Sequence, residues 1–320
     1  MELGSKKHGR SIPAIVGPTA SGKSDLGIAL ALATDGEVIN LDSVQVYRGL
    51  YSATSKVPAS GQQGIPHHLI DIAEPAENFT AGEYARRASA TIRDVESRGR
   101  RSVLVGGTGF YLRALVHPLF ESPETDIELR GRLKQLVEEN GPEYLHRMLE
   151  RLDEKAAARI SPRDWSRTMR ALEFRFQTGL KISESQPDSP SPAEFTHRIV
   201  VIALAPPRGE LYAVINARAE RMFASGLVEE VRTLVDSGVP LDAKAFQAHG
   251  YRRVVEYFQG LLTLEQALEQ MKLDTRHYAK RQLSWWRRWP GVKWINRFGN
   301  ETEAVGEALQ LIEEYEQARD

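Results

Sequence analysis

Cysteine is absent from this 320-residue sequence, and charge of either sign is not in excess. The lack of cysteine excludes a disulfide framework and any zinc site built on thiolates, and it fits a reducing compartment. The 42 lysine and arginine residues almost balance the 43 aspartate and glutamate residues, which leaves a net charge of −1. A nucleic-acid partner would therefore have to bind a local basic surface rather than the protein as a whole.

A long apolar segment is also missing. No run approaches the roughly 18–20 residues needed to cross a bilayer. The polar N-terminus, residues 1–10, lacks the apolar stretch of a signal peptide. We therefore expect a cytoplasmic protein with no membrane partner. The apolar content of 41% is ordinary, so a sizeable core can form in one large α/β domain or in a core with an insertion.

Strands alternate with helices in the first third of the chain. We predict strands at 11–18, 37–41 and 102–105 and helices at 25–33 and 80–97, with a further strand at 198–205. Thr80 and Glu83 have the spacing of a capping box at the start of the second helix. This alternation predicts an α/β fold in which a parallel sheet has helices on both faces.

The pattern changes between about Ser122 and Gln186, where charged helical stretches (127–140, 142–152 and 164–177) replace strands. The segment ends in the proline- and serine-rich stretch 186–192, which is typical of a linker. We therefore predict a core in two parts, 1–121 and 187–320, with a helical insertion at 122–186. Helices are expected in the second part at 210–225, 227–237, 251–259 and 264–289, and the acidic tail 301–320 is expected to be a solvated surface helix.

The strongest motif fits the Walker pattern G-x-x-x-x-G-K-[ST] and comprises Gly17, Pro18, Thr19, Ala20, Ser21, Gly22, Lys23 and Ser24. Its glycines let backbone N–H groups surround phosphate oxygens, and the following helix N-terminus favours an anion. Lys23 supplies a positive charge, and the Ser24 hydroxyl can bind Mg²⁺. A glycine turn without a ligand would give the same letters, but the predicted strand before and helix after favour a P-loop NTPase-like core that binds a diphosphate group.

Asp42 follows the second predicted strand, at an edge where such sheets bind ligands. It can be a general base or metal partner, or it can cap the turn that follows. Gly106-Gly107-Thr108-Gly109 also ends a strand and is either a tight turn or a place where substrate approaches closely. His67-His68 lacks a third ligand at a suitable spacing, so a structural or substrate-adjacent role is favoured over metal binding.

Basic and aromatic residues interleave between Arg276 and Arg288. Such a surface suits a phosphate backbone with bases stacked on aromatic rings, but an amphipathic core helix with a solvated rim explains the pattern equally well. The predicted insertion adds a weaker basic signal, diluted by acidic neighbours, at Arg130, Arg132, Arg163, Arg167 and Arg170.

Taken together, the motifs resemble those of the bacterial tRNA dimethylallyltransferases (tRNA isopentenyltransferases). They run in order over nearly the whole chain: GPTASGKS, LDSVQVYRG, GIPHHLID, NFTAGEYARRA, VLVGGTGFYLRAL, TMRALEFRFQTG, INARAERMFASGLVEEV, HGYRR and TRHYAKRQLSWWR. The P-loop alone is widespread, whereas DS-x-x-x-Y-R-G followed by GGTG-x-Y and YAKRQ is specific.

The resemblance implies transfer of a dimethylallyl group from its diphosphate to the exocyclic N6 of the adenosine beside the anticodon of tRNA. It implies that Asp42 is the general base, that Thr19 positions it, and that Lys23 and Arg218 neutralise diphosphate, with Mg²⁺ on Ser24. The implied tRNA contacts are Asp42, Ser43, Val44, Gln45, Thr108, Arg130, Arg167, Arg170, Gln247, Gly250, Tyr251, Arg252, Lys280, Arg281, Gln282 and Arg287. The insertion matches the region that clasps the anticodon stem, and we expect a monomer.

The sequence departs from the family pattern at Ala53, Ser55, Val57, Arg163, His249 and Ser284, which affects local loop geometry and fine tRNA contacts. Three other functions remain open. A P-loop small-molecule kinase would leave the basic helix and the insertion unexplained. Prenylation of free AMP is found in relatives that generally lack a full insertion. A non-enzymatic RNA-binding protein would not need Asp42 beside an intact P-loop.

Overall fold

A computed structural model describes residues 9–117, 123–185 and 193–319. The chain forms two compact units, one from Met1–His117 with Pro192–Asp320 and one from Pro118–Ser191. The predicted boundaries at 121/122 and 186/187, and the predicted linker at 186–192, lie outside the described residues. Each unit is described below by itself.

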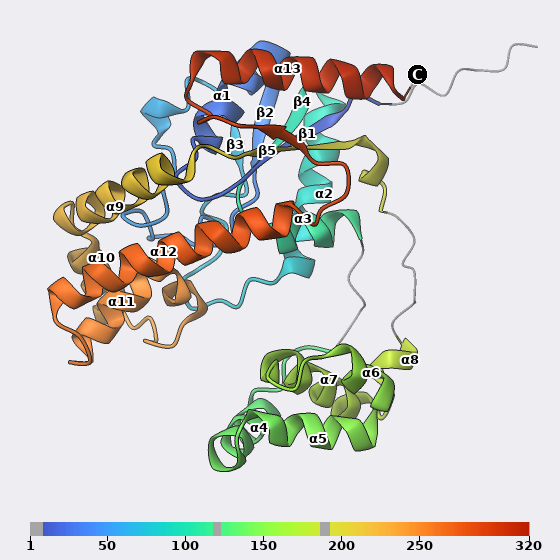
Figure 1. Cartoon of the computed structure of the whole chain (residues 1–320), viewed down its shortest axis with the longest axis vertical. Helices are drawn as coiled ribbons and strands as arrows, with labels where there is room; N and C mark the ends of the chain where they lie inside the picture. Colours follow the sequence, from blue (N-terminus) through green and yellow to red (C-terminus); the bar gives the residue numbers. More distant parts are fainter. Residues whose placement is uncertain (1–8, 118–122, 186–192, 320) are drawn as a thin grey trace, which may run out of the picture. The chain divides into compact units, whose positions relative to one another are not determined.

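The larger unit is built on a six-stranded parallel sheet (Figure 1). Across the sheet the strands are β3 (His67–His68), β2 (Gly36–Asn40), β4 (Arg101–Val105), β1 (Ile12–Val16), β5 (Ile199–Leu204) and β6 (Lys293–Ile295). The predicted α/β fold is confirmed. Because all six strands are parallel, the loops that follow β1, β2 and β4 leave the sheet at the same edge.

Both faces of the sheet are covered, which explains why its strands are almost continuously apolar. Ile15 faces one hydrophobic cluster, together with α1 (Lys23–Thr34) and α13 (Thr302–Gln317). Ala14 and Val16 face the other, with α2 (Ala81–Ser97) and α3 (Gly109–Val116). The core therefore lies in two layers, one on each side of the sheet.

Four further helices extend the second layer: α9 (Arg208–Ala224), α10 (Leu227–Asp236), α11 (His249–Phe258) and α12 (Leu264–Trp286). Short 3₁₀ turns occupy Ala59–Gly61, Thr196–Arg198 and Lys244–Gln247. A full capping box starts α12, where Thr263 and Gln266 bond each other's backbone N–H.

The capping box predicted at Thr80 forms only in part. The Thr80 hydroxyl accepts from the Glu83 N–H, but the Glu83 carboxylate instead pairs with Arg86 and Arg87 one turn along α2. The two arginines take up the carboxylate that a capping box would need. The spacing of Thr80 and Glu83 was therefore not sufficient to predict a full capping box.

The smaller unit contains α4 (Ile127–Asn140), α5 (Pro142–Leu152), α6 (Glu154–Arg159), α7 (Trp165–Thr178) and α8 (Ile182–Ser185). It has its own hydrophobic core around Leu133, Leu145, Leu149 and Leu172. Asp153 caps α6 and also accepts from both the N–H and the hydroxyl of Ser183, which ties α8 to α6. The two short helices α6 and α8 were not predicted, because each is too short to show a periodic pattern.

The acidic tail forms a helix on the surface, as predicted, but one face of this helix is buried. In α13, Ala304, Ala308 and Ile312 are buried against the cluster that includes α1, and Glu316 accepts from the N–H (3.0 Å) and hydroxyl (2.6 Å) of Ser11. Figure 1 shows α13 (red) alongside α1. Ala304, Ala308 and Ile312 recur every four positions, which is typical of the buried face of a helix. The many glutamates around them led instead to the prediction of a solvated helix. None of the described helices combines the length and the apolar character that crossing a membrane requires.

Candidate active site

Three predicted motifs meet at the carboxyl edge of the sheet. The P-loop, Gly17 to Ser24, follows β1; Asp42 follows β2; and the turn from Gly106 to Gly109 follows β4, which lies between them in the sheet. The Asp42 side of this arrangement is joined to the turn by Thr108, whose hydroxyl accepts from the Ser43 N–H at 3.0 Å. The sheet topology thus brings together residues that are about 90 positions apart in the chain.

The P-loop has the backbone shape that its glycines allow. Gly22 precedes α1 in the left-handed region (φ +81°), and a Cβ there would come within 2.8 Å of the Gly299 nitrogen. Gly17 (φ +140°) is equally confined, because a Cβ would meet the Leu204 carbonyl oxygen at 2.8 Å. The loop and the N-terminus of α1 line a cavity of about 800 Å³. This is the geometry that a helix N-terminus offers to an anion.

Lys23 is partly buried and lines this larger cavity, where its Nζ donates to the Pro18 carbonyl at 2.7 Å. Burial lowers the pKa of Lys23 to about 8; the nearby Asp42 carboxylate raises it and Arg218 lowers it further. Arg218, from α9, lines the same cavity, and burial likewise lowers its pKa. Two desolvated cations therefore face the cavity, a costly arrangement that a bound anion would relieve. Ser24 also lines this cavity.

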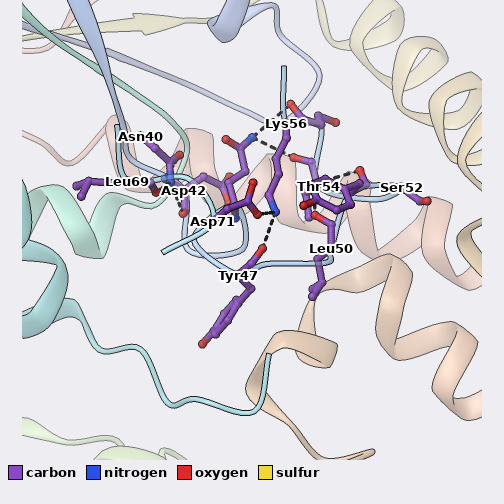
Figure 2. Close-up of polar contacts among 12 residues, drawn as sticks. Asn40, Asp42, Tyr47, Leu50, Ser52, Thr54, Lys56, Leu69 and Asp71 are labelled. Carbon is purple, nitrogen blue, oxygen red and sulfur yellow. Dashed lines mark hydrogen bonds and ion pairs between the residues drawn. The ribbon is translucent and has the colours of Figure 1, made fainter. Parts of the chain in front are cut away.

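Asp42 is held by its neighbour Asn40, which is buried at the end of β2. The Asn40 side chain accepts from the Asp42 N–H and donates to the Asp42 carbonyl and to the Leu69 carbonyl, each at 3.0 Å (Figure 2). The Asp42 Oδ1 accepts from the Val44 N–H at 2.9 Å, so the residue does cap the following turn. Within the described part of the chain its Oδ2 has no hydrogen bond. Oδ1 can therefore cap the turn while Oδ2 is available to act as a base.

The loop after Asp42 is tied to the wall of the larger cavity by two side chains (Figure 2). Gln45 donates to the Thr54 carbonyl at 3.0 Å, and the buried Lys56 ammonium pairs with Asp71 at 2.6 Å and also donates to the Tyr47 carbonyl. Thr54 and Lys56, the positions that keep the family pattern here, thus hold the loop in place.

The start of the segment that departs from the family pattern is bound by Glu230. Glu230 of α10 accepts from both the N–H (2.9 Å) and the hydroxyl (2.8 Å) of Ser52 and from the Tyr251 hydroxyl (2.6 Å). Ser55 has a φ of +55°. The carboxylate of Glu230 anchors the loop from outside the altered motif.

A second cavity of about 370 Å³ adjoins the first, and both are lined by Thr19, Asp42 and Arg218. Its wall includes Gln247, Gly250 and Arg281, three of the residues predicted to contact tRNA, together with His249 and Tyr278. His249 packs edge-on against the Tyr278 ring at 5.1 Å, and burial lowers the pKa of His249, which keeps the imidazole neutral. Asp42 therefore lies where the cavity of the P-loop and a cavity with an aromatic and basic wall come together.

The residues predicted to contact tRNA in the larger unit differ in exposure. Lys280 and Arg281 of α12, Arg287 directly after it, and Arg252 of α11 are exposed. Tyr251 and Gln282 are buried and bonded within the protein: the Tyr251 hydroxyl to Glu230, and the Gln282 amide to the backbone of Thr19 and Gly107. Ser43, Val44 and Gln45 lie in the loop after Asp42.

The predicted arginines of the smaller unit are partly engaged in ion pairs. Arg130 and Arg170 both bind the buried carboxylate of Glu173. Arg167 is exposed and lies near Asp164, and Arg163 is exposed. Glu173 pairs with both Arg130 and Arg170, and about a third of each arginine side chain is still exposed.

The turn from Gly106 to Gly109 was expected to be a tight turn or a place of close substrate approach, and the structure gives a different reason for its glycines. A Cβ on Gly106 would meet the Leu41 backbone at 2.3 Å, one on Gly107 the Gln282 amide at 2.0 Å, and one on Gly109 the Trp285 indole at 2.1 Å. Other atoms of the protein occupy the space that a side chain at any of these three glycines would need.

The His67-His68 pair forms β3 and is bonded within the protein. The His68 Nε2 contacts the buried Glu37 carboxylate at 2.7 Å, and the His67 Nδ1 contacts the Ile65 carbonyl at 2.9 Å. His67 also lines the larger cavity. Over the described residues no group of three or more metal-binding side chains is assembled.

The IPP transferase family model matches residues 45–289, which is most of the sequence. The chain belongs to the IPP transferase family. It is 45% identical to the tRNA dimethylallyltransferase of Koribacter versatilis (strain Ellin345), over 93% of this chain and 96% of the relative.

Two solved structures of similar proteins agree with this membership of the IPP transferase family. The full-length tRNA isopentenylpyrophosphate transferase of Bacillus halodurans has a TM-score of 0.71 at 36% identity, over 97% of this chain and 99% of that one. A eukaryotic dimethylallyltransferase acting on tRNA has a TM-score of 0.73 at 28% identity, over 87% of this chain and 70% of that one. The family resemblance predicted from the motifs is confirmed.

One residue at the site of this IPP transferase family member was not predicted from the sequence. Asn40 holds the backbone of Asp42 through its side-chain amide. It could have been suspected, because an amide two residues before a strand-end carboxylate can form an Asx-type turn. Tyr278, in the predicted basic and aromatic helix, lines the second cavity.

Proposed function

We propose that this chain transfers a dimethylallyl group from dimethylallyl diphosphate to the exocyclic N6 of the adenosine adjacent to the anticodon in tRNA, giving N6-dimethylallyladenosine. The observation that carries this proposal is that Asp42 is shared by two adjoining cavities. The larger cavity is lined by the P-loop with Lys23 and by Arg218, two cations that suit the diphosphate. The smaller has aromatic and basic walls, which suit a base on a phosphate backbone. The names of the similar proteins support the same reaction.

Each group has one task in this reaction. The P-loop amides, Lys23 and Arg218 hold the diphosphate, and they stabilise the charge that collects on it as the allylic C1–O bond breaks. The N6 nitrogen forms the new bond to C1 and loses a proton, which the Asp42 carboxylate accepts. The diphosphate leaves with the electron pair of the C1–O bond. Thr19, at the junction of the two cavities, positions Asp42.

A magnesium ion fits the residues around the diphosphate. The Ser24 hydroxyl lines the larger cavity next to the P-loop amides, and the described residues gather no larger set of metal ligands. Mg²⁺ commonly binds in this way, through one or two protein oxygens with substrate phosphates and water. When bound, it would neutralise charge on the leaving diphosphate. We assign Ser24 as its protein ligand.

The acceptor is a flipped adenosine in a folded anticodon stem-loop. A base inside the stack cannot reach Asp42, and its extrusion costs a few kcal/mol. We assign the exposed basic residues of α11 and α12, the loop from Ser43 to Gln45, and the smaller unit to binding this RNA. An enzyme with a tRNA substrate acts in the cytoplasm, as a monomer in this proposal.

Mass spectrometry of nucleosides tests the proposal. Unmodified tRNA incubated with the protein and dimethylallyl diphosphate should yield N6-dimethylallyladenosine beside the anticodon, and omission of either substrate should abolish it. Free AMP as acceptor tests the alternative prenylation. Release of ADP from ATP with small-molecule acceptors tests the kinase alternative. Product on AMP at a rate similar to that on tRNA, or none on tRNA, would contradict the proposal.

A further inference from the structure

One face of α12 packs on the Gly106–Gly109 turn of the site. Tyr278, Gln282 and Trp285 are spaced by four and three residues and therefore lie on the same side of the helix. The Gln282 amide donates to the Gly107 carbonyl, the Trp285 indole packs on Gly109, and Tyr278 lines the second cavity. Figure 1 shows α12 passing α3, which starts at this turn.

Gln282 makes the most informative of these contacts. Its Oε1 accepts from the Thr19 N–H at 2.8 Å, and its Nε2 donates to the Gly107 carbonyl at 3.0 Å. The side chain is only 5% exposed. One amide therefore joins the P-loop after β1 to the turn after β4, and its two bonds are to backbone groups that cannot move without moving their loops.

The bond to Thr19 has a consequence for the P-loop. Because the Thr19 N–H points to Gln282, it does not take part in holding the anion, and the orientation of the Thr19 peptide is fixed from outside the loop. Thr19 is one of the residues at the junction of the two cavities, where Asp42 also lies. A shift of about 1 Å at such a position can cost a factor of about 10² in rate.

We propose that Gln282 is a positioning residue for the transfer reaction: it fixes the P-loop at Thr19 relative to the Gly107 turn, and it makes no contact with RNA. The rate measurements that test this assignment rest on the proposed function. The assignment separates Gln282, which is buried, from its neighbours Lys280 and Arg281 in sequence, whose side chains are exposed.

Two variants break the same contact from opposite sides. Gln282→Met keeps the size of the side chain but removes both the donor and the acceptor. Gly107→Ala adds a Cβ that would lie 2.0 Å from the Gln282 Nε2, so the amide must move. Gln270→Met is the matched control, because Gln270 lies on the same helix and is exposed. The double variant Gly107→Ala/Gln282→Met completes a cycle.

Single-turnover rates with saturating tRNA and donor should fall about 10–100-fold in Gln282→Met and in Gly107→Ala, while the Kd for an anticodon stem-loop stays within about twofold of wild type. The double variant should be no slower than the slower single variant, because both remove one shared contact. Gln270→Met should match wild type. An unchanged rate, additive losses, or a loss of RNA affinity with an unchanged saturated rate would overturn the proposal.

A donor-only measurement separates this inference from the proposed function. Calorimetry with dimethylallyl diphosphate in the absence of RNA should show about 3–10-fold weaker binding in both single variants, since the P-loop loses its external support. Unchanged donor affinity would overturn the positioning role whatever the acceptor is. Failure of the wild-type protein to modify tRNA would instead contradict the proposed function alone. If Gln282→Met does not fold, Gly107→Ala carries both measurements.

Discussion

At the residue scale, Asp42 caps the turn that follows it and is also the base of the proposed reaction. Its Oδ1 caps the turn at Val44, while Asn40 fixes its backbone on both sides of the peptide. The backbone and one carboxylate oxygen of Asp42 are therefore held in place, and Oδ2 is the oxygen left for the reaction. A carboxylate prepared in this way loses little entropy when it accepts a proton.

The variant Asp42→Asn separates these roles. The side-chain oxygen of the introduced amide can still accept from the Val44 N–H, so the fold and both substrate affinities should be preserved. The amide cannot accept a proton from N6, so single-turnover rates should fall by about 10²–10⁴. Asp35→Asn, at the exposed end of α1, is the matched control and should be neutral. Near-wild-type rates in Asp42→Asn would leave Asp42 with the capping role only.

Lys23→Ala should abolish transfer while leaving tRNA binding largely intact. Lys23 lines the larger cavity, whereas the basic residues of α11 and α12 assigned above to RNA binding do not line it. Rates with saturating donor and filter binding of an anticodon stem-loop measure the two effects. Normal turnover at saturating donor would show that the P-loop assignment is wrong.

The pKa of Lys23 also predicts how donor binding depends on pH. Burial lowers this pKa to about 8, and the diphosphate binds the charged form. Affinity for dimethylallyl diphosphate without RNA should therefore be constant below pH 8 and fall up to about tenfold per unit above it. Calorimetry between pH 7 and pH 10 tests this, with Lys23→Ala as a reference that should lack the fall. A wild-type profile that is flat to pH 10 would contradict it.

At the element scale, the carboxyl ends of β1, β2 and β4 carry the site, and this much was predictable from strands followed by glycine and carboxylate motifs. What was not predictable is how α12 supports them. The bond from Gln282 to Thr19 spans 263 positions, and no local pattern encodes it. The strands β3 and β6 were missed because two or three residues give no periodicity.

The packing of α12 on the Gly106–Gly109 turn predicts opposite effects for two glycines at helix starts. Gly109→Ala places a Cβ 2.1 Å from the Trp285 indole, and the resulting overpacking should cost about 1–3 kcal/mol of stability. Gly82→Ala, in the first turn of α2, has its nearest neighbour at 3.9 Å and should stabilise by about 0.5–1 kcal/mol. Denaturant unfolding measures both. Equal effects would argue against close packing at this turn.

At the scale of the whole molecule, the two units have separate hydrophobic cores. The helical segment was recognised from its change in pattern, whereas the ion pairs of Arg130 and Arg170 with Glu173 were not, because acidic and basic residues alternate there. Since the P-loop and both cavities are formed within the larger unit, that unit should hold the donor without help from the smaller one.

Removal of residues 122–186 with a short glycine-rich bridge should therefore divide the two functions. Affinity for dimethylallyl diphosphate should be preserved, and affinity for tRNA should be largely lost with the arginines of the smaller unit.

In the intact protein, tRNA binding should weaken steeply with salt, because each phosphate neutralised by lysine or arginine releases a counterion. Free AMP offers neither those contacts nor the alignment of N6 with Asp42, so it should be a negligible acceptor. Initial rates with tRNA, an anticodon stem-loop and AMP at two salt concentrations test these points together. Undiminished tRNA turnover after the deletion would contradict the RNA-binding role of the smaller unit, and AMP turnover close to that of tRNA would favour prenylation of the free nucleotide.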